Sequence, residues 1–378
     1  MGHDRERAGM SRNGFHIAVF DGDGIGPEVM APCLAILDAA VAAAGAPRLE
    51  REHLPGGAEA YAKDGDALPD SALKAAEKAD AILLSAMGDP SIRYADGTEI
   101  APQLDLRFVF ELYAGVRPVR PIPGLPIPLA DPRARKMDFV LIRESTEGLF
   151  AARGKGVVTE DGGEAHDTMV ITRAGTERLT RFGLDLARAR KRDGHPGKLT
   201  LIDKANIFTS MAFMRGVFGA VTAGQGDIAT ERMYVDAAAL NMVRNPWAFD
   251  VMITENMYGD ILSDLGAGLM GGMGVAPSAD VGDRHAVFQP CHGSAPDIRG
   301  QGKANPVAMI LSGAMMLDWL GERHGEAAAV TAGRLVRDAV DEAFRAGGLL
   351  PFELGGSAGT REIAETVMAG LKGVAARR

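Results

Sequence analysis

Cysteine is scarce in this chain of 378 residues, which has only Cys33 and Cys291. Two cysteines in a chain this long cannot build a disulfide framework, so the sequence indicates a reducing compartment, and we expect the cytoplasm. Aromatic residues are also few, at 6%, but hydrophobic residues make up 46% and charged residues 24% of the chain. This composition is ordinary for a soluble globular protein, and the length is enough for two domains with a sizeable core.

Positive charge is in deficit, because the formal net charge at pH 7 is -9. A nucleic-acid-binding surface is therefore not expected. Long apolar runs are missing as well, so we expect no membrane span. Residues 1–13 are polar and charged and contain no hydrophobic region, which favours a mobile tail over a signal peptide.

The first apolar segment, residues 15–20, predicts a buried strand that runs into a glycine-rich loop and then a helix beginning near Pro27. This arrangement looks like the dinucleotide-binding motif of a Rossmann fold. However, Gly22, Gly24 and Gly26 do not have the spacing that the motif requires. We therefore do not predict a Rossmann fold.

Strands and helices continue to alternate along the chain, which is typical of an α/β fold with a parallel sheet covered on both faces. Gly-broken, alternating segments over residues 149–171 predict a small hairpin arm. Two late helices, residues 304–320 and 326–344, are expected to pack back on the first sheet.

Two acidic residues, Asp260 and Asp264, follow a predicted buried strand at residues 249–254. If a helix begins near Tyr258, the two carboxylates lie four residues apart on one helix face. Such a pair can bind Mg²⁺, which takes one or two protein carboxylates and fills its other positions with substrate and water. The alternative is structural: one acidic side chain interacts with the helix dipole and the other is solvated.

The segment from Asn256 to Asp264 closely resembles the signature of the β-decarboxylating dehydrogenases, the family of 3-isopropylmalate, isocitrate, homoisocitrate, tartrate and D-malate dehydrogenases. The resemblance extends from about residue 14 to about residue 370 and is closest to the isopropylmalate branch. It implies a two-domain isopropylmalate/isocitrate dehydrogenase-like fold, with parallel-rich sheets flanked by helices. Residues 1–113 and 271–378 would form the larger, cofactor-side domain. Residues 114–270 would form a second domain with the dimer arm and interface helices.

The same resemblance implies the substrate side of the site. Arg107, on a helix predicted over residues 101–113, together with Arg117 and Arg143 matches the arginines that bind substrate carboxylates in the family. Guanidinium groups suit this task because they keep their charge and grip a carboxylate with two hydrogen bonds. Asn206 is implied as a further substrate contact.

Two more residues match the family's catalytic groups: Lys204, which would act as the base, and Asp236, a third carboxylate on the metal side. In the family these two residues come from the partner subunit. The resemblance therefore implies a homodimer with active sites shared between subunits. The implied metal ligands are Asp236, Asp260 and Asp264, and the implied cation is Mg²⁺ or Mn²⁺.

A second specific segment, residues 289–298, matches the family's adenosine-binding loop. Within it, the Asp297 carboxylate can accept hydrogen bonds from both ribose hydroxyls and would repel a 2′-phosphate. NADP-preferring relatives carry Lys and Tyr at the positions of Asp297 and Ile298, so NAD is the expected cofactor. The implied cofactor contacts are Ile25, His292, Gly293, Ser294, Ala295, Asp297 and Asn305.

Two substrate-side positions depart from the family pattern. Phe150 stands where the family has a tyrosine that helps to protonate the enolate left by decarboxylation, and a phenyl ring cannot donate a proton. Gln103 stands four residues before Arg107, where an apolar side chain would contact an isopropyl group. Because a buried amide requires a polar partner, a substrate with a hydroxyl or carboxylate substituent is a credible alternative.

These observations predict an NAD- and divalent-metal-dependent enzyme for the oxidative decarboxylation of a 3-substituted (2R)-malate, of the 3-isopropylmalate type. A D-malate or tartrate-type dehydrogenase with a polar C3 substituent is the main alternative. A third hypothesis, a degenerate regulatory paralogue, is motivated by Phe150 and disfavoured by the retained aspartates, lysine and arginines.

Overall fold

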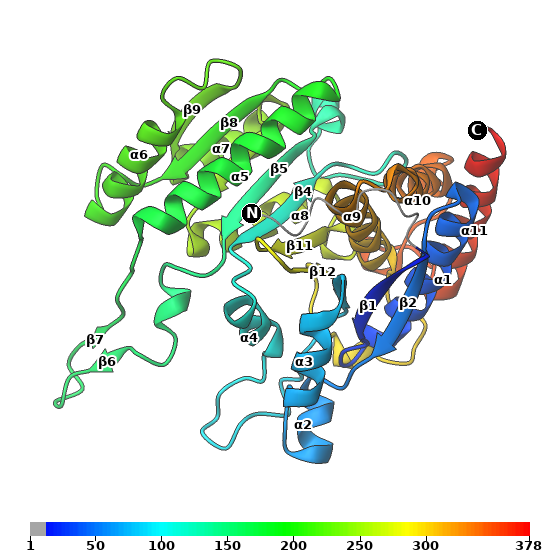
Figure 1. Cartoon of the computed structure of the whole chain (residues 1–378), viewed down its shortest axis with the longest axis horizontal. Helices are drawn as coiled ribbons and strands as arrows, with labels where there is room; N and C mark the ends of the chain where they lie inside the picture. The colour runs from blue at the N-terminus through cyan, green and yellow to red at the C-terminus, as the bar shows by residue number, and fades with distance from the viewer. Residues whose placement is uncertain (1–12) are drawn as a thin grey trace.

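One large sheet forms the centre of the molecule in the computed structural model, which describes residues 13–378 (Figure 1). The tail predicted for residues 1–13 lies outside this range apart from its last residue. The ten strands of the sheet have the order β2-β1-β3-β12-β11-β4-β5-β10-β8-β9. Their bounds are β1 (Gly14–Phe20), β2 (Arg48–His53), β3 (Ala81–Leu84), β4 (Ala114–Val119), β5 (Phe139–Glu144), β8 (Lys198–Asp203), β9 (Ala229–Tyr234), β10 (Val251–Thr254), β11 (Pro277–Val281) and β12 (Ala286–Pro290).

Parallel pairing dominates both ends of this sheet, and the antiparallel pairs lie at its centre, where β11 pairs with β12 and β4, and β4 pairs with β5. Every residue of β3 and β10 is buried, as expected for apolar strands that are covered on both faces. The fold is therefore the predicted α/β arrangement, with a parallel-rich sheet flanked by helices.

Strand order also separates the chain into two groups. The strands of residues 1–113 and 271–378 occupy one half of the sheet, and those of residues 114–270 occupy the other. The sheet itself is continuous through the β11–β4 pair. The division into two domains at these boundaries stays a prediction.

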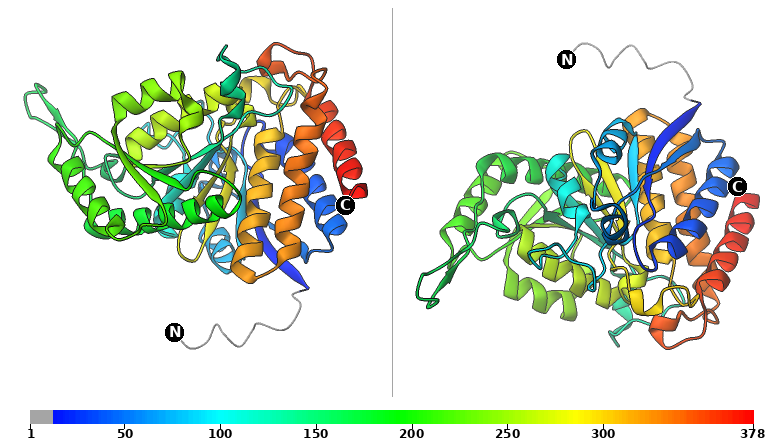
Figure 2. Two further views of the ribbon diagram at one scale, coloured as in Figure 1. Left: turned by 90° about the horizontal axis from the view of Figure 1, so that it is seen from above. Right: turned by 90° about the horizontal axis from the view of Figure 1, so that it is seen from below.

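Helices cover the sheet on both faces (Figure 2). On one half α9 packs on β11, β12 and β3, and on the other half α8 packs on β5 and β4 while α5 packs on β10. The helices are α1 (Gly26–Ala44), α2 (Ala58–Asp64), α3 (Asp70–Lys78), α4 (Pro102–Val109), α5 (Arg173–Arg192), α6 (Thr209–Thr222), α7 (Val235–Arg244), α8 (Asn256–Met270), α9 (Val307–His324), α10 (Ala327–Arg345) and α11 (Thr360–Ala376).

Two helix predictions need correction. The helix that carries Arg107 ends at Val109, because the chain turns at Glu111, which has a positive φ of 50°, and enters β4. The second late helix, α10, packs mainly on α9, α11 and α1 instead of on the sheet, since α9 already covers those strands.

Helix α1 corrects the expectation that long apolar runs are missing. By length and hydropathy alone, this helix is apolar enough to cross a membrane. Its apolar residues face the protein core, where α1 packs against α9, α10 and α11. The sequence pattern obscures this run because Glu28 and Asp38 interrupt it.

The predicted hairpin arm is present. Strands β6 (Val157–Val158) and β7 (Ala165–His166) pair with each other in a separate two-stranded sheet. The arm projects away from the body of the molecule in all views (Figures 1 and 2).

Helix α8 approaches β5 very closely at Gly259. A Cβ atom added at this glycine would lie 2.6 Å from Cβ of Arg143 and 3.0 Å from its Cα. Neither atom can move without moving β5. The glycine therefore sets the distance between the helix that carries Asp260 and the strand that carries Arg143.

We expect Gly259→Ala to lower the free energy of unfolding by about 1–3 kcal/mol through overpacking. Gly268→Ala is the matched control on the same helix, because nothing lies within 4 Å of its added Cβ. That control should raise the free energy of unfolding by about 0.5–1 kcal/mol through helix propensity. Chemical denaturation of the two variants measures both effects, and equal stabilities would contradict the close approach.

Candidate active site

A cavity of about 190 Å³ opens at the centre of the sheet, where its two halves meet. Strands β4, β5, β11 and β12 and helices α4 and α8 all contribute side chains to it. Its lining is Ala86, Met87, Gln103, Arg107, Arg117, Arg143, Asp260, Ser263, Asp264, Ser278, Gln289, Pro290, Cys291, His292 and Gly293. The structure thus brings the three predicted arginines and two predicted aspartates together.

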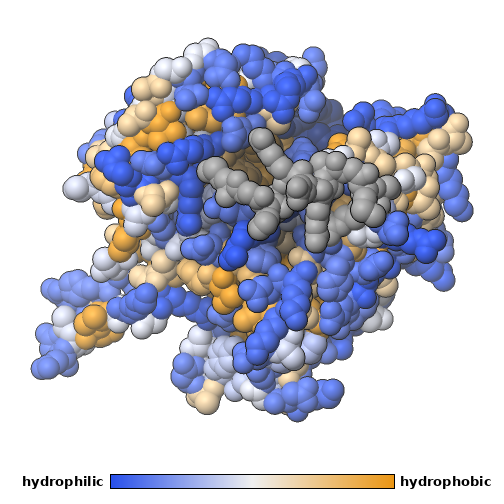
Figure 3. Space-filling model, in the orientation of Figure 1, coloured by the Kyte–Doolittle hydropathy of each residue, from blue (hydrophilic) through white to orange (hydrophobic). Residues whose placement is uncertain are grey.

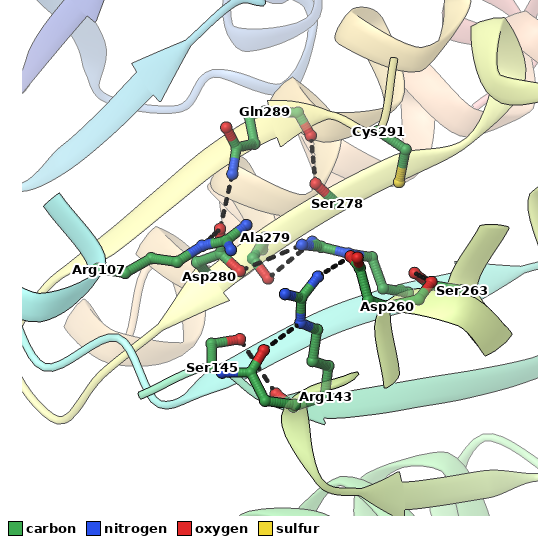
Figure 4. Close-up of polar contacts among 12 residues, drawn as sticks. Arg107, Arg143, Ser145, Asp260, Ser263, Ser278, Ala279, Asp280, Gln289 and Cys291 are labelled. Carbon is green, nitrogen blue, oxygen red and sulfur yellow. Dashed lines mark hydrogen bonds and ion pairs between the residues drawn. The ribbon is translucent and has the colours of Figure 1, made fainter. Parts of the chain in front are cut away.

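Two of the arginines share one buried carboxylate, that of Asp280 on β11 (Figure 4). Arg107 Nε donates to Asp280 Oδ2 at 3.0 Å, and an Arg117 amino group donates to Oδ1 at 3.3 Å. Gln289 Nε2 also donates to Oδ2, at 2.6 Å. Burial opposes ionisation of Asp280, but Arg107 and Arg117 outweigh it, so the pKa of this carboxyl is lowered.

The third arginine, Arg143 on β5, faces the same cavity from the other side. Its Nε donates to Asn256 Oδ1 at 2.8 Å, and its Nη1 is ion-paired with Asp260. The guanidinium carbon lies 4.7 Å from the centre of the Phe150 ring, in cation–π geometry. Burial and the nearby Arg107 lower the pKa of Arg143 to about 10, so it remains charged at neutral pH.

Helix α8 presents Asp260 and Asp264 to the cavity, as the spacing predicted. The helix begins at Asn256, where the Glu255 carboxylate accepts hydrogen bonds from two backbone N–H groups and fixes its first turn. Partial burial and the neighbouring Asp260 raise the pKa of Asp264. Two carboxylates that repel each other at a cavity wall form a donor set suited to a hard divalent cation.

The third predicted metal ligand is not part of this group. Asp236 lies in the first turn of α7, where it is ion-paired with Lys204 at the end of β8. Asn206 is exposed nearby, and none of the three lines the cavity. Accordingly, no group of three His, Cys, Asp or Glu side chains that could hold a metal occurs among residues 13–378.

Five of the seven predicted cofactor residues line a neighbouring cavity of about 280 Å³, and Ser294 and Asp297 do not. Ile25, His292, Gly293, Ala295 and Asn305 line it, and His292 and Gly293 also line the arginine cavity. The two cavities therefore share a wall.

Backbone contacts hold this second cavity together. Ile25 N donates to the carbonyl of Ser294 at 2.8 Å, and the Ser294 hydroxyl donates to the carbonyl of Gly88. Asp297 is exposed beside the cavity and does not line it. His292 Nε2 is buried without a hydrogen-bond partner, which suits a histidine whose ring contacts a bound ligand.

The two departures from the family pattern lie on different sides of Arg107. Gln103 lines the arginine cavity, and its Oε1 is buried without a hydrogen-bond partner. Phe150 instead lines an apolar cavity of about 460 Å³ together with Leu104 and Phe108. Arg107 contributes to the walls of both cavities.

Sequence reasoning missed Asp280 and Gln289. A signal existed, because Asp280 is the only charged residue in the buried strand Pro277–Val281. A carboxylate in such a strand must be paired, and cationic side chains elsewhere in the chain are its natural partners.

Comparison with known proteins decides the family. The family model described as isocitrate/isopropylmalate dehydrogenase matches residues 16–367. The chain belongs to this family. It is therefore a dehydrogenase that acts on a CH–OH group.

Named relatives agree with this assignment. The chain is 39% identical to a 3-isopropylmalate/3-methylmalate dehydrogenase of Methanocaldococcus jannaschii, over 93% of this chain and 97% of that protein. It is 40% identical to a 3-isopropylmalate dehydrogenase of Aquifex aeolicus, over 81% and 84% of the two chains. A crystal structure of an isocitrate dehydrogenase from Methylococcus capsulatus matches with a TM-score of 0.80 and 33% identity, over 95% and 99% of the chains.

Gln103 and Gln289 both line the dehydrogenase's arginine cavity, but replacing them by leucine should change the free energy of unfolding in opposite directions. Replacing Gln103 by Leu removes a buried, unpaired oxygen and should raise the free energy of unfolding of the ligand-free protein by about 1 kcal/mol. Gln289→Leu, the matched control, removes a donor to Asp280 and should lower it by about 1–3 kcal/mol. Urea denaturation separates the two, and a destabilised Gln103→Leu would show that its amide is already satisfied.

Proposed function

We propose that this protein catalyses the NAD- and divalent-metal-dependent oxidative decarboxylation of a 3-substituted (2R)-malate, of the 3-isopropylmalate type. The observation that carries the proposal is the convergence of Arg107, Arg117 and Arg143 with Asp260 and Asp264 on one cavity. Guanidinium groups bind the carboxylates of such a substrate, and the family relatives named for 3-isopropylmalate support the substrate class.

The cavity residues are proposed to bind and orient the substrate, and Lys204, outside the cavity of its own chain, is assigned the role of base by the family resemblance. The arginines orient the substrate carboxylates, and the buried cavity walls keep bulk water away. A divalent cation held by Asp260 and Asp264 would polarise the substrate oxygen, and the nicotinamide would accept hydride. Lys204 would take the hydroxyl proton as hydride leaves the carbon that bears the hydroxyl, so that a ketone forms. The β-carboxylate can then depart as CO₂, and the electron pair of the broken C–C bond forms an enolate. Water or another side chain would protonate this enolate, because Phe150 cannot.

The cofactor is proposed to be NAD. The shared wall of His292 and Gly293 would bring its nicotinamide end to the arginine cavity, while Ile25, Ala295 and Asn305 contact the adenosine end. Asp297 is exposed beside that cavity, so its carboxylate can reach a ribose and repel a 2′-phosphate. We also propose a cytoplasmic location, which suits the free thiols of Cys33 and Cys291.

A homodimer would complete the site, because Lys204 and Asp236 lie outside the cavity of their own chain. Exposed apolar side chains support an interface. Leu240 and Val243 on α7 and Ile261 on the adjoining α8 are all more than two-fifths exposed. Val157 and Val158 are exposed on the arm, where Figure 3 shows a small hydrophobic patch set back from the hydrophilic tip. Such patches are typical of protein–protein interfaces.

Subunit complementation tests the shared site. Lys204→Ala and Asp264→Ala should each abolish turnover as homodimers. A heterodimer of the two, isolated with two affinity tags, has one site with both residues intact and should regain about half of the wild-type activity. If both residues act within one chain, neither site of the heterodimer is complete. An inactive heterodimer of native mass would therefore exclude sharing.

Gln103 favours a second candidate, a D-malate or tartrate-type dehydrogenase. Its unpaired Oε1 can accept a hydrogen bond from a hydroxyl substituent on the substrate. The apolar cavity beside Phe150, Leu104 and Phe108 favours an alkyl substituent instead. We give preference to the alkyl substituent, since this cavity adjoins Arg107 and is the larger of the two.

The substrate panel decides between the two candidates. NADH formation with Mn²⁺ is measured for 3-isopropylmalate, D-malate, the tartrate isomers, isocitrate and homoisocitrate, in the wild type and in Gln103→Leu. We expect the wild type to turn over 3-isopropylmalate. Gln103→Leu should raise the ratio of kcat/KM for 3-isopropylmalate to kcat/KM for tartrate by about tenfold. Turnover of tartrate or D-malate alone would favour the second candidate. No NADH formation with any of these substrates, together with no Mn²⁺ binding, would favour the regulatory paralogue.

A further inference from the structure

We propose that Asp280 sets the charge class of the substrate, so that the cavity accepts a dicarboxylate and rejects a tricarboxylate. This inference rests on the proposed function, and it assigns a specificity role to a residue that does not touch the reacting atoms. Asp280 acts through Arg107 and Arg117, whose charge it partly neutralises before any substrate binds.

The buried position of Asp280 keeps its carboxylate in contact with Arg107 and Arg117 when a ligand binds. Its residue is 0% exposed, and it lies in the middle of β11 with strands on both sides. Gly115 is its register partner on β4, and a Cβ at that glycine would lie 3.1 Å from Asp280 Oδ1. Three donors, two of them guanidinium groups, hold the carboxylate in place. The arginines can therefore bind substrate only while they remain paired with it.

Counting the charges around the cavity gives the substrate charge. Arg107, Arg117 and Arg143 bring three positive charges, and Asp280 cancels one of them. Asp260 and Asp264 would balance a divalent cation. Two positive charges remain for the substrate, which matches the two carboxylates of a substituted malate.

Other titratable groups at the cavity do not change this count. His292 is deprived of water by burial, which lowers its pKa, so the imidazole is neutral at neutral pH. Burial likewise raises the pKa of the Cys291 thiol and keeps it protonated. A third substrate carboxylate would find no unpaired cationic side chain among the cavity residues and would stay uncompensated in a desolvated site.

Anion binding to the Mg²⁺-loaded, NAD-free protein tests the inference without turnover. Succinate and tricarballylate are matched probes, a dianion and a trianion without a hydroxyl group. Calorimetric titrations are run with saturating Mg²⁺ and without NAD, on the wild type, on Asp280→Asn and on Asp341→Asn. The control removes a carboxylate that pairs with Arg120 away from the cavity. In Asp280→Asn the amide oxygen can still accept from Arg107 and Gln289, whereas Arg117 loses its carboxylate acceptor, and thermal melting shows whether the fold is kept.

We expect the wild type to bind succinate more tightly than tricarballylate. Asp280→Asn should shift the ratio of the two affinities toward tricarballylate by about tenfold or more, since one extra charge becomes available in a buried site. Asp341→Asn should leave the ratio unchanged. In turnover assays the same shift should appear as a lower KM of Asp280→Asn for isocitrate relative to 3-isopropylmalate.

Several outcomes would overturn the inference. If the wild type binds tricarballylate at least as tightly as succinate, Asp280 does not exclude a trianion, and this result needs no variant. The inference also fails if a folded Asp280→Asn keeps the wild-type ratio of affinities. In both cases turnover of a malate-type substrate would leave the proposed function standing. Binding of neither anion, with no turnover on the substrate panel, would refute both.

Discussion

Burial of three guanidinium groups in one small cavity is the constraint around which the centre of this molecule is built. Three like charges held close together repel one another, and removing them from water is costly unless carboxylates compensate them. Asp280 compensates Arg107 and Arg117, and Asp260 compensates Arg143. Of these three ion pairs, Arg117–Asp280 joins β4 of one half to β11 of the other and so ties the two halves of the sheet together.

The same pairs leave the arginines ready to bind a ligand. Each guanidinium carries several donors, and Asp280 or Asp260 engages only some of them. A substrate carboxylate can therefore use the remaining donors without forcing a rearrangement. The unfavourable free energy of bringing three guanidinium groups together arises during folding and not during substrate binding. The cavity is therefore preorganised.

Much of this arrangement could be predicted from the sequence because its signals are local. Apolar runs gave the strands, helical spacing placed Asp260 and Asp264 on one face of α8, and the alternation of elements gave the α/β class. The family resemblance added the arginines, which look like ordinary surface residues when each is considered alone. The family and the fold are confirmed by the comparisons.

What the sequence could not provide depends on contacts between distant segments. Asp280 meets Arg117 only because β11 pairs with β4 in one register, with Asp280 opposite Gly115. Local patterns contain no information on that register. Nor could they show that α9 leaves α10 no access to the sheet, or that Lys204 and Asp236 lie outside the cavity of their own chain.

The continuity of the sheet through β4 and β11 has a mechanical consequence. The two halves are joined here by three residue pairs, Ala279 with Val116, Asp280 with Gly115 and Val281 with Ala114. No flexible linker separates them at this seam, so the cavity can narrow or widen only as far as the strands twist about it. Any relative rotation of the two halves must therefore twist β4 and β11, and Asp280 lies within that pairing, opposite Gly115. The strand that holds the carboxylate between Arg107 and Arg117 is thus also the strand that joins one half to the other.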